Sequence, residues 1–387
     1  MSTLKVAALQ GVSASSDAIT LANDGTCTAN LTNRTNKNLV VNGAFLIAQR
    51  STSSTSQGYG SVDRFRIIYN GTDEAPTQAQ ADVAAGTTPY TSGFRKSFKV
   101  TNGNQTGGAG GSDYIMIRTT LEAQDIANSG WNYTSTSSYI TLSFWVKSSV
   151  AQNFYGHIRS IDGTGQRYAF ETGSLSADTW TKVTKTISGN SNLQFDNNAN
   201  EGLHITMFPF FGTDYTDSGV SLNTWGAYVG GTQTPDQTST WYTTNDATFE
   251  ITGVQLEVSD HATDFEHRSF ADELNRCFRY YEQFNSNGLA ETHFASGYFE
   301  NDTTAKFCLL YTRKRAAPTI TASAASTFTS LNTGSIPAAT GLSIHRQTER
   351  AAEFRLTVPT ISGADGQSCI LISVSSTEAT IKIDSEL

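Results

Sequence analysis

Catalytic signatures, paired cysteines and long apolar runs are all missing from this chain of 387 residues. There is no G-x-S-x-G, H-E-x-x-H, P-loop or Rossmann fingerprint, so no common enzyme class is indicated. Its four cysteines, Cys27, Cys277, Cys308 and Cys369, are far apart and include no C-x-x-C pair. A zinc site or redox motif is therefore not expected, and we predict no metal and no cofactor. Cys277 and Cys308 lie in apolar patterns, which predicts buried reduced thiols.

Charge is also scarce. Charged residues make up 16% of the chain, and the net charge is −9 with no basic run, which argues against nucleic acid as a partner. No apolar stretch reaches the length of a membrane span, so we expect no membrane insertion. The N-terminus, MSTLKVAALQ, has neither the basic region nor the apolar run of a signal peptide. We therefore expect the chain to be made and folded in a cytoplasm.

What the chain does contain is a series of short alternating segments separated by Gly- and Asn-rich turns. Such spacing predicts an all-β jelly-roll sandwich, and the lack of a 20–50-residue repeat argues against a propeller or β-helix. Apolar residues on both faces of 249–258 predict a strand inside the sandwich, with Gly253 at a bulge. Phe144 or Trp145 is expected in the core. The expected strands of this part are 94–101, 113–122, 138–148, 153–161, 167–173, 180–189, 203–211 and 247–258.

The pattern changes once to a helical period, after Ser269. An apolar stripe with i, i+4, i+7, i+8 and i+11 spacing predicts about four turns of helix, with Ser269 as the N-cap. This helix either connects two domains by docking on the next sheet or lines an oligomer axis. The stripe, our candidate oligomer interface, is Phe270, Leu274, Cys277, Phe278 and Tyr281.

These elements predict four segments. Residues 1–37 hold a marginal hairpin around Asn23-Asp24-Gly25, which must dock on something to be stable. Residues 38–268 form the jelly roll, 269–285 the connecting helix, and 286–387 a second, smaller β-sandwich domain.

Aromatic residues in polar loops are the best candidates for a binding site. A ring beside amides and carboxylates suits a sugar, but loop aromatics are also common at subunit interfaces, and some only pack the loop. The sequence leaves these alternatives open. The candidates for carbohydrate binding are Trp131, Tyr133, Trp225, Tyr228, Trp241 and Tyr242.

Three stretches together resemble phage tail-fibre and receptor-binding virion proteins. They are NLVVNGAFLIAQR followed by SVDRF, then SYITLSFWVKS, and then ITGVQLEVSDHATDFEHRSFADELNRCFRYYE. The middle part is similar to a carbohydrate-binding-module jelly roll, and the resemblance covers about residues 1–285. It implies a structural homotrimer with its N-terminus on the particle and its C-terminal domain distal. The matching motif positions, for which the resemblance implies a structural role, are Gln255, Leu256, Glu257, Phe265, Glu266, His267 and Arg268.

The sequence thus predicts a non-enzymatic virion protein, with a tail fibre that attaches to host-cell-surface glycans as the first hypothesis. Other virion proteins would be bound through residues 1–37. The alternative is a purely architectural fibre, adaptor or capsid-decorating protein whose aromatics lie at subunit interfaces. A capsule-degrading glycan hydrolase is the third hypothesis, since a glycosidase needs two carboxylates facing each other across a cleft.

Overall fold

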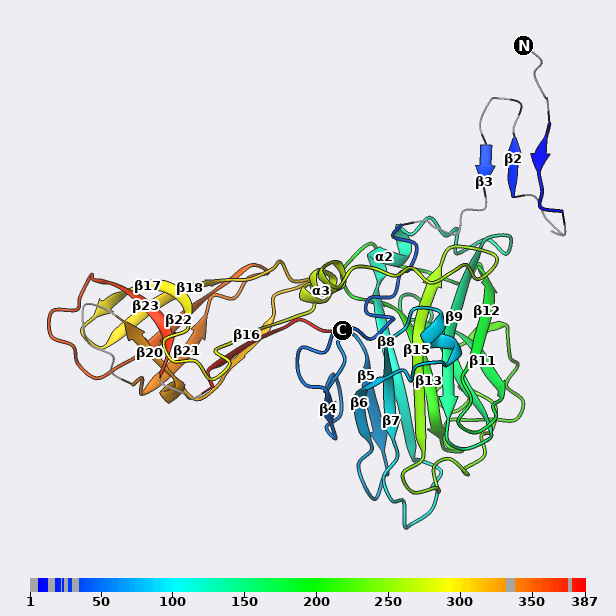
Figure 1. Ribbon diagram of the computed structural model, residues 1–387, viewed down its shortest axis with the longest axis horizontal. Coiled ribbons are helices and arrows are strands. Elements are labelled where there is room, and N and C mark those ends of the chain that lie inside the picture. Colours follow the sequence, from blue (N-terminus) through cyan, green and yellow to red (C-terminus); the bar gives the residue numbers. More distant parts are fainter. Residues whose placement is uncertain are drawn as a thin grey trace.

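The structure is a computed structural model that describes residues 6–12, 18–21, 23, 27–29, 35–331, 338–374 and 378–387. It is all-β, and its largest part is a two-sheet sandwich (Figure 1). A smaller β part stands beside the sandwich, beyond helix α3 (Phe270–Phe278), and a small N-terminal sheet lies apart from both. The all-β fold predicted from the sequence is confirmed.

The sandwich consists of two six-stranded antiparallel sheets. The first has the order β14-β11-β10-β13-β8-β5, and the second β12-β9-β15-β7-β6-β4. The first sheet contains β5 (Arg66–Asn70), β8 (Tyr114–Glu122), β10 (Asn153–Ser160), β11 (Gln166–Ser174), β13 (Glu201–Phe211) and β14 (Trp225–Ala227). The second contains β4 (Ser53–Ser54), β6 (Thr77–Asp82), β7 (Lys96–Thr101), β9 (Tyr139–Ser148), β12 (Thr181–Ser188) and β15 (Thr248–Glu257).

Period-two alternation decides which side chains fill the space between the sheets. Phe144 on β9 is fully buried in this core, whereas its neighbour Trp145 is half-buried on the outer face against Phe94 and Phe265. Strand β15 lies inside its sheet, between β9 and β7, as its two apolar faces predicted. Gly253 has φ of +64°, and the pairing of β15 with β9 shifts register there, so the predicted bulge is confirmed.

Helices are short in the described chain. They are α1 (Thr88–Thr91), α2 (Ala123–Ala127) and α3. Ser269 caps α3, because its side chain accepts a hydrogen bond from the Asp272 amide, as predicted. The predicted helix over 269–285 is too long, however, since Tyr281 begins a strand. The segment after Phe278 has few β-branched residues, and its apolar residues continue the helical spacing. It nevertheless forms a strand, because it pairs with the strand Thr380–Asp384 near the C-terminus. No helix of the described residues is long and apolar enough to cross a membrane.

The C-terminal part has its own core between a three-stranded and a six-stranded sheet. Their orders are β16-β24-β19 and β20-β23-β17-β18-β22-β21. The strands are β16 (Tyr281–Asn285), β17 (His293–Asn301), β18 (Thr304–Leu310), β19 (Thr319–Ala322), β20 (Phe328–Leu331), β21 (Gly341–His345), β22 (Ala351–Thr357), β23 (Ser368–Ser373) and β24 (Thr380–Asp384), with a 3-10 turn at Ala325–Thr327.

Alternation also corrects one cysteine prediction. On β18, Phe307 and Leu309 face the C-terminal core, so the residue between them, Cys308, points outward and is exposed. Cys277 on α3 is buried, as predicted, and burial raises the pKa of its thiol.

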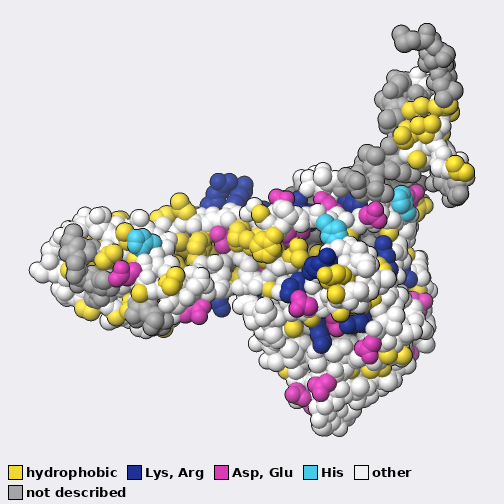
Figure 2. All heavy atoms as spheres, viewed as in Figure 1, with side chains coloured by type: hydrophobic (Ala, Val, Ile, Leu, Met, Phe, Trp, Pro, Cys, Tyr) yellow, Lys and Arg dark blue, Asp and Glu magenta, His cyan; other side chains and the backbone are white. Residues whose placement is uncertain are grey.

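The N-terminal sheet consists of β1 (Ala8–Leu9), β2 (Ile19–Leu21) and β3 (Cys27–Ala29), all antiparallel. The predicted hairpin is therefore present as β2 and β3, although Asp24 and Gly25 of its turn lie outside the described residues. Val6, Leu9, Val12 and Leu21 are exposed. Figure 2 shows apolar side chains gathered in this part of the molecule.

A buried ionic cluster joins the C-terminus to the sandwich. Arg64 is fully buried, has φ of +69°, and pairs with Glu386. Its guanidinium lies 3.4 Å from the centroid of the Tyr280 ring, and it donates to the Thr120 carbonyl. Arg50 pairs with Glu386 at 3.4 Å as well. The last residues of the chain thus hold the first strands of the sandwich and the end of α3 together.

Replacing Glu386 with Gln should leave Arg64 buried without its counter-charge. Breaking a buried pair on one side costs about 3–5 kcal/mol, so we expect a clear fall in the free energy of unfolding, measured by denaturant titration. Glu378→Gln is the matched control, since Glu378 is exposed and bonds only Asn285 among the described residues. Equal stability of the two variants would contradict the structural role of this cluster.

Candidate functional site

The outer face of the first sheet collects basic side chains from five strands. Arg66 on β5 lies directly opposite Arg118 on β8, and Arg159 on β10 lies directly opposite Arg167 on β11. Side chains in such positions are about 4.5–5.5 Å apart at Cβ and share a face. We call this surface the arginine face. Its members are Arg66, Arg118, Arg159, Arg167, His157 and His204.

Strand pairing also places the two histidines on this face. His204 on β13 lies opposite Arg159, and His157 on β10 lies opposite Thr206, which is in turn opposite Arg118. The residues in between, such as Ile158 and Ile205, point into the sandwich core. The same alternation that buries the apolar side chains therefore gathers the basic ones outside.

Several polar atoms of the arginine face are buried without a hydrogen-bond partner among the described residues. His157 is 1% exposed and His204 3% exposed. Both ring nitrogens of His157 and Nδ1 of His204 lack partners, as do Nε and Nη1 of Arg167, which is 8% exposed. Native structures leave few buried polar atoms unpaired, so this face can accept hydrogen bonds from a ligand or donate to one.

One carboxylate, Glu201, is in direct contact with the basic groups. Its hydrogen bond with His204, at 3.2 Å, lowers its pKa to about 2, and Arg66 at 3.6 Å contributes in the same direction. Burial lowers the pKa of His204 to about 4. Burial also lowers the pKa of Arg118 to about 10, with the neighbouring charges of Arg66 and Arg159 acting in the same direction. The face therefore carries positive charge at neutral pH from its arginines, with its histidines neutral.

One of the six predicted aromatics, Tyr228, lies at the edge of the arginine face, and Trp225 is nearby on the edge strand β14 (Trp225–Ala227). The Tyr228 ring covers the guanidinium of Arg159, whose carbon lies 3.5 Å from the ring centroid. Trp225 on β14 lies opposite the core residue Tyr168, so its ring is on the inner side of the edge strand. There it packs against Tyr168, and its indole nitrogen donates to the Ser188 carbonyl. Both rings are half-buried.

A pocket of about 410 Å³ opens beside Trp225. Arg167 lines it from β11, together with hydroxyl and carboxylate groups of the loop that precedes β14 and of the segment after it. Rings, hydroxyls and a few charges in one concave surface are typical of small-ligand sites. The lining residues are Arg167, Asp217, Gly219, Val220, Ser221, Thr224, Trp225, Gly226 and Thr232.

The other four predicted aromatics are elsewhere. Trp131, Trp241 and Tyr242 are buried in the sandwich core, so their assignment as sugar-stacking rings is wrong. Their sequence surroundings are polar because the loop backbones are at the surface, while the rings turn inward. Tyr133 is half-buried and packs edge-on against Phe195 at 5.0 Å.

The predicted oligomer stripe is divided in the same way. Cys277 and Tyr281 are buried within their own chain, so they cannot face a symmetry axis, and their assignment is wrong. Phe270 is 60% exposed, and Leu274 and Phe278 are half-buried. The physical reason is that the inner side of α3 packs on the junction of the two β parts, which a lone helix pattern could not show.

The motif residues around the end of β15 form a hydrogen-bonded corner. The Gln255 side chain accepts from the Glu266 amide at 2.8 Å, and a Glu257 oxygen accepts from the Thr263 amide at 2.9 Å. Glu266 accepts from the Asn38 amide, and Arg268 donates to the Val40 carbonyl. Leu256 is buried in the core, and the rings of Phe265 and His267 pack on Phe94.

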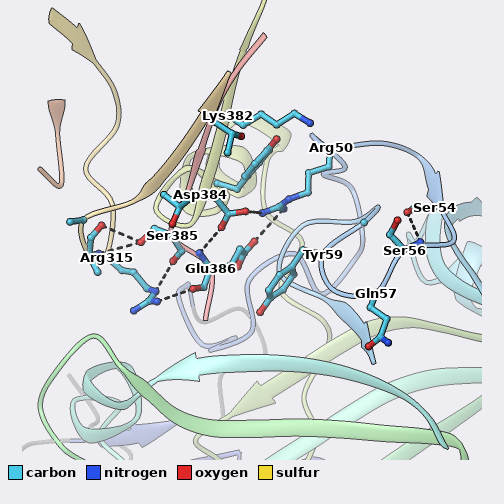
Figure 3. Close-up of a pocket in the computed structure, with 16 residues that line it drawn as sticks. Arg50, Ser54, Ser56, Gln57, Tyr59, Arg315, Lys382, Asp384, Ser385 and Glu386 are labelled. Atoms are coloured by element: carbon cyan, nitrogen blue, oxygen red, sulfur yellow. Dashed lines mark hydrogen bonds and ion pairs between the residues drawn. The ribbon is translucent and has the colours of Figure 1, made fainter. Parts of the chain in front are cut away.

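Another pocket, of about 720 Å³, lies at the junction beside β24 (Figure 3). Arg50 points to Asp384 at 3.0 Å and stacks 3.6 Å from the Tyr281 ring centroid. Arg315 donates to the carbonyls of Ser385 and Glu386. Because these charges already have partners within the chain, the pocket is better explained as part of the junction than as a ligand site.

Sequence reasoning missed the arginine face, because no two of its arginines form a basic run. The available signal was a histidine and an arginine at alternate positions of one strand, as in HIR (157–159). Only strand pairing shows that these positions are neighbours.

Comparison with known proteins found no matching family model and no matching curated protein. Among solved structures, the enzymatically active domain of bacteriophage CBA120 tailspike protein 4 is 13% identical over 57% of this chain and 21% of that chain, with a TM-score of 0.29. The match thus spans about a fifth of the tailspike chain.

Two bacterial structures give similar values. The N-terminal cellulose-binding domain of Cellulomonas fimi β-1,4-glucanase C is 10% identical over 54% of this chain and 96% of that domain, with a TM-score of 0.28. A putative sugar binding protein of Bacteroides thetaiotaomicron is 14% identical over 58% of this chain and 100% of that one, with a TM-score of 0.29. These values are too low to assign the chain to a family.

Because His204 is buried, we predict that the folded protein loses stability in acid. Its pKa of about 4 lies below the ordinary value of 6.5, so between these pH values the unfolded chain binds more protons than the folded one. Stability should therefore fall as the pH is lowered through this window, by on the order of 1–2 kcal/mol at pH 5 from this residue.

The measurement is the denaturant unfolding free energy at pH 7 and pH 5, in wild type and in His204→Gln. Asp63, whose pKa burial raises to about 6, acts in the opposite direction in both proteins, so the difference between them is the quantity that matters. Between pH 7 and pH 5, His204→Gln should lose less unfolding free energy than wild type does. The control His345→Gln, at an exposed position, should lose as much as wild type. The same loss in all three proteins would contradict the assignment.

Proposed function

We propose that the chain is a non-catalytic virion attachment protein that binds host-surface glycans with the first sheet of its sandwich. The observation that carries this proposal is the pocket beside Trp225, where a half-buried indole, Arg167, Asp217 and several hydroxyls line one concave surface. Such a surface offers a ring for the apolar face of a sugar and polar groups for its hydroxyls. The resemblance to phage receptor-binding proteins supplies the virion context.

The non-catalytic part of the proposal is supported by the electrostatics of the arginine face. Its contacting carboxylate, Glu201, has a pKa of about 2, which is far too low for a general acid at neutral pH. A glycosidase would need a second carboxylate at about 5–10 Å across the same cleft, one of the pair with a raised pKa. The arginine face therefore fits binding better than hydrolysis.

Attachment to other virion proteins is proposed for residues 1–37. Within the described part of this segment, Leu9, Val12 and Leu21 are exposed on or beside a three-stranded sheet. A small sheet with exposed apolar side chains is marginal alone in water and becomes stable by packing on a partner.

The glycan-binding proposal predicts that Trp225→Ala and Tyr228→Ala weaken binding to host cells and to an array of bacterial surface polysaccharides by roughly tenfold or more. Removing either ring takes away contact area at the pocket or the cover of Arg159. Trp180→Ala is the matched control, because this half-buried Trp lies at the start of β12 in the other sheet. Wild-type binding by a folded Trp225→Ala protein would remove the pocket from the proposal.

The second candidate is a purely architectural oligomer, which the exposure of Phe270 favours. Light scattering of a homotrimer would give a mass near three times 41.7 kDa. Phe270→Glu should then shift the mass toward that of one chain, because a charge cannot be buried unpaired at an interface. Leu289→Glu, at an equally exposed loop position, is the control. A monomeric wild type would contradict the trimer, and a trimer that binds no cells or glycans would favour the architectural role.

A further inference from the structure

The arginine face contains two arrangements that are unfavourable for folding. Arg66 and Arg118 are directly opposed on β5 and β8, and Arg159 and Arg167 are directly opposed on β10 and β11. Like charges in directly opposite positions of an antiparallel pair destabilise the sheet. A chain with only 26 lysines and arginines in 387 residues has placed four of them in two such pairs on one face.

Three of these four charges have no ion-pair partner within the described chain. Arg66 reaches Glu201 at 3.6 Å, but Arg118, Arg159 and Arg167 make no ion pair with any described carboxylate. Arg118 donates instead to the neutral Thr206 hydroxyl at 3.2 Å. Asp217 lines the pocket beside Arg167, yet its Oδ1 accepts the Gly219 amide at 2.7 Å rather than a guanidinium.

The hydrogen-bond donors that lack a partner are also buried. Arg167 is more than nine-tenths buried and keeps Nε and Nη1 without a partner, and Nε of Arg159 is likewise buried and unpaired. The two groups lie on neighbouring strands, with His204 next in the same row. Guanidinium groups present their donors in a planar fork that matches the oxygens of a carboxylate or a phosphate.

We infer that the arginine face binds an oxyanion of the glycan, so that the chain selects acidic over neutral surface polysaccharides. Arg159 and Arg167 donate to the carboxylate or phosphate ester of one sugar, while Trp225 and the hydroxyls beside it contact the neighbouring sugar. This inference rests on the proposed glycan binding and adds the charge of the ligand. It also explains why opposed arginines persist, since the bound anion offsets their repulsion.

A glycan fits this site better than a nucleic acid does. The arginines are half-buried or buried within one sheet face, whereas nucleic acids are bound by exposed basic patches or stripes that follow the phosphate backbone.

The test uses the full chain, an array of acidic and neutral bacterial surface polysaccharides, and titration with the polysaccharide that binds best. We expect the bound polysaccharides to be acidic. Carbodiimide reduction of their carboxylates, or hydrofluoric acid cleavage of their phosphate esters, should abolish binding and shows which oxyanion is recognised. Binding restricted to neutral polysaccharides would overturn the inference and leave the proposed glycan binding intact. Binding to none of them would overturn both.

Variants locate the oxyanion. Arg159→Gln and Arg167→Gln should each weaken binding of the acidic polysaccharide by roughly tenfold or more, while their thermal midpoints stay equal to or above that of wild type, since each relieves an opposed pair. The matched control is Arg95→Gln. Arg95 stacks on Tyr90 at 3.9 Å, much as Arg159 stacks on Tyr228, but lies outside the first sheet. Unchanged affinity in folded Arg159→Gln and Arg167→Gln would overturn the site.

A competition experiment tests whether the arginine face binds nucleic acid instead. Single-stranded DNA added at equal charge concentration should not displace the acidic polysaccharide from the wild-type chain. Displacement by DNA that is lost in Arg167→Gln would reassign the face to nucleic acid and overturn the inference.

Discussion

Burial of the apolar side of two six-stranded sheets is the constraint on which the other features of the sandwich depend. Each strand has a period of two, so a strand that sends Ile158 or Ile205 into the core must send Arg159 or His204 to the other side. Burying an isolated charge between the sheets would cost several kcal/mol, so the positions of the arginines follow from the core. The binding surface is in this sense the reverse side of the hydrophobic core.

The junction follows a different rule. Arg64, Glu386, Arg50 and Asp384 are packed between the sandwich, α3 and the last strand, and each has a partner of opposite charge. A satisfied network of this kind orients two parts of a chain and offers little to a ligand. The arginine face has the same type of side chain without those partners. The contrast between paired and unpaired guanidinium groups is what separates a structural pocket from a candidate binding site in this molecule.

Local patterns predicted much of the fold. Alternation identified the sandwich strands, the capping pattern located Ser269 at the start of α3, and Gly253 was recognised at a bulge. Local patterns gave the wrong result where one stretch of sequence is compatible with two structures. Residues after Phe278 continue an apolar helical period, but β16 pairs with β24, which lies a hundred residues away. Trp131 and Trp241 lie in polar loops, yet their rings turn into the core because large apolar surfaces gain most from burial.

The sequence by itself determined the all-β class, the alternation within each strand and the scarcity of charge, because these depend on residue type and on near neighbours. Tertiary structure alone decided which strands are adjacent and in which register, and therefore that Arg159 meets Arg167 and that Arg66 meets Arg118. Strand pairing depends on contacts between residues far apart in the chain, and a shift by one residue would reverse the face of every side chain. The candidate site exists only at that level.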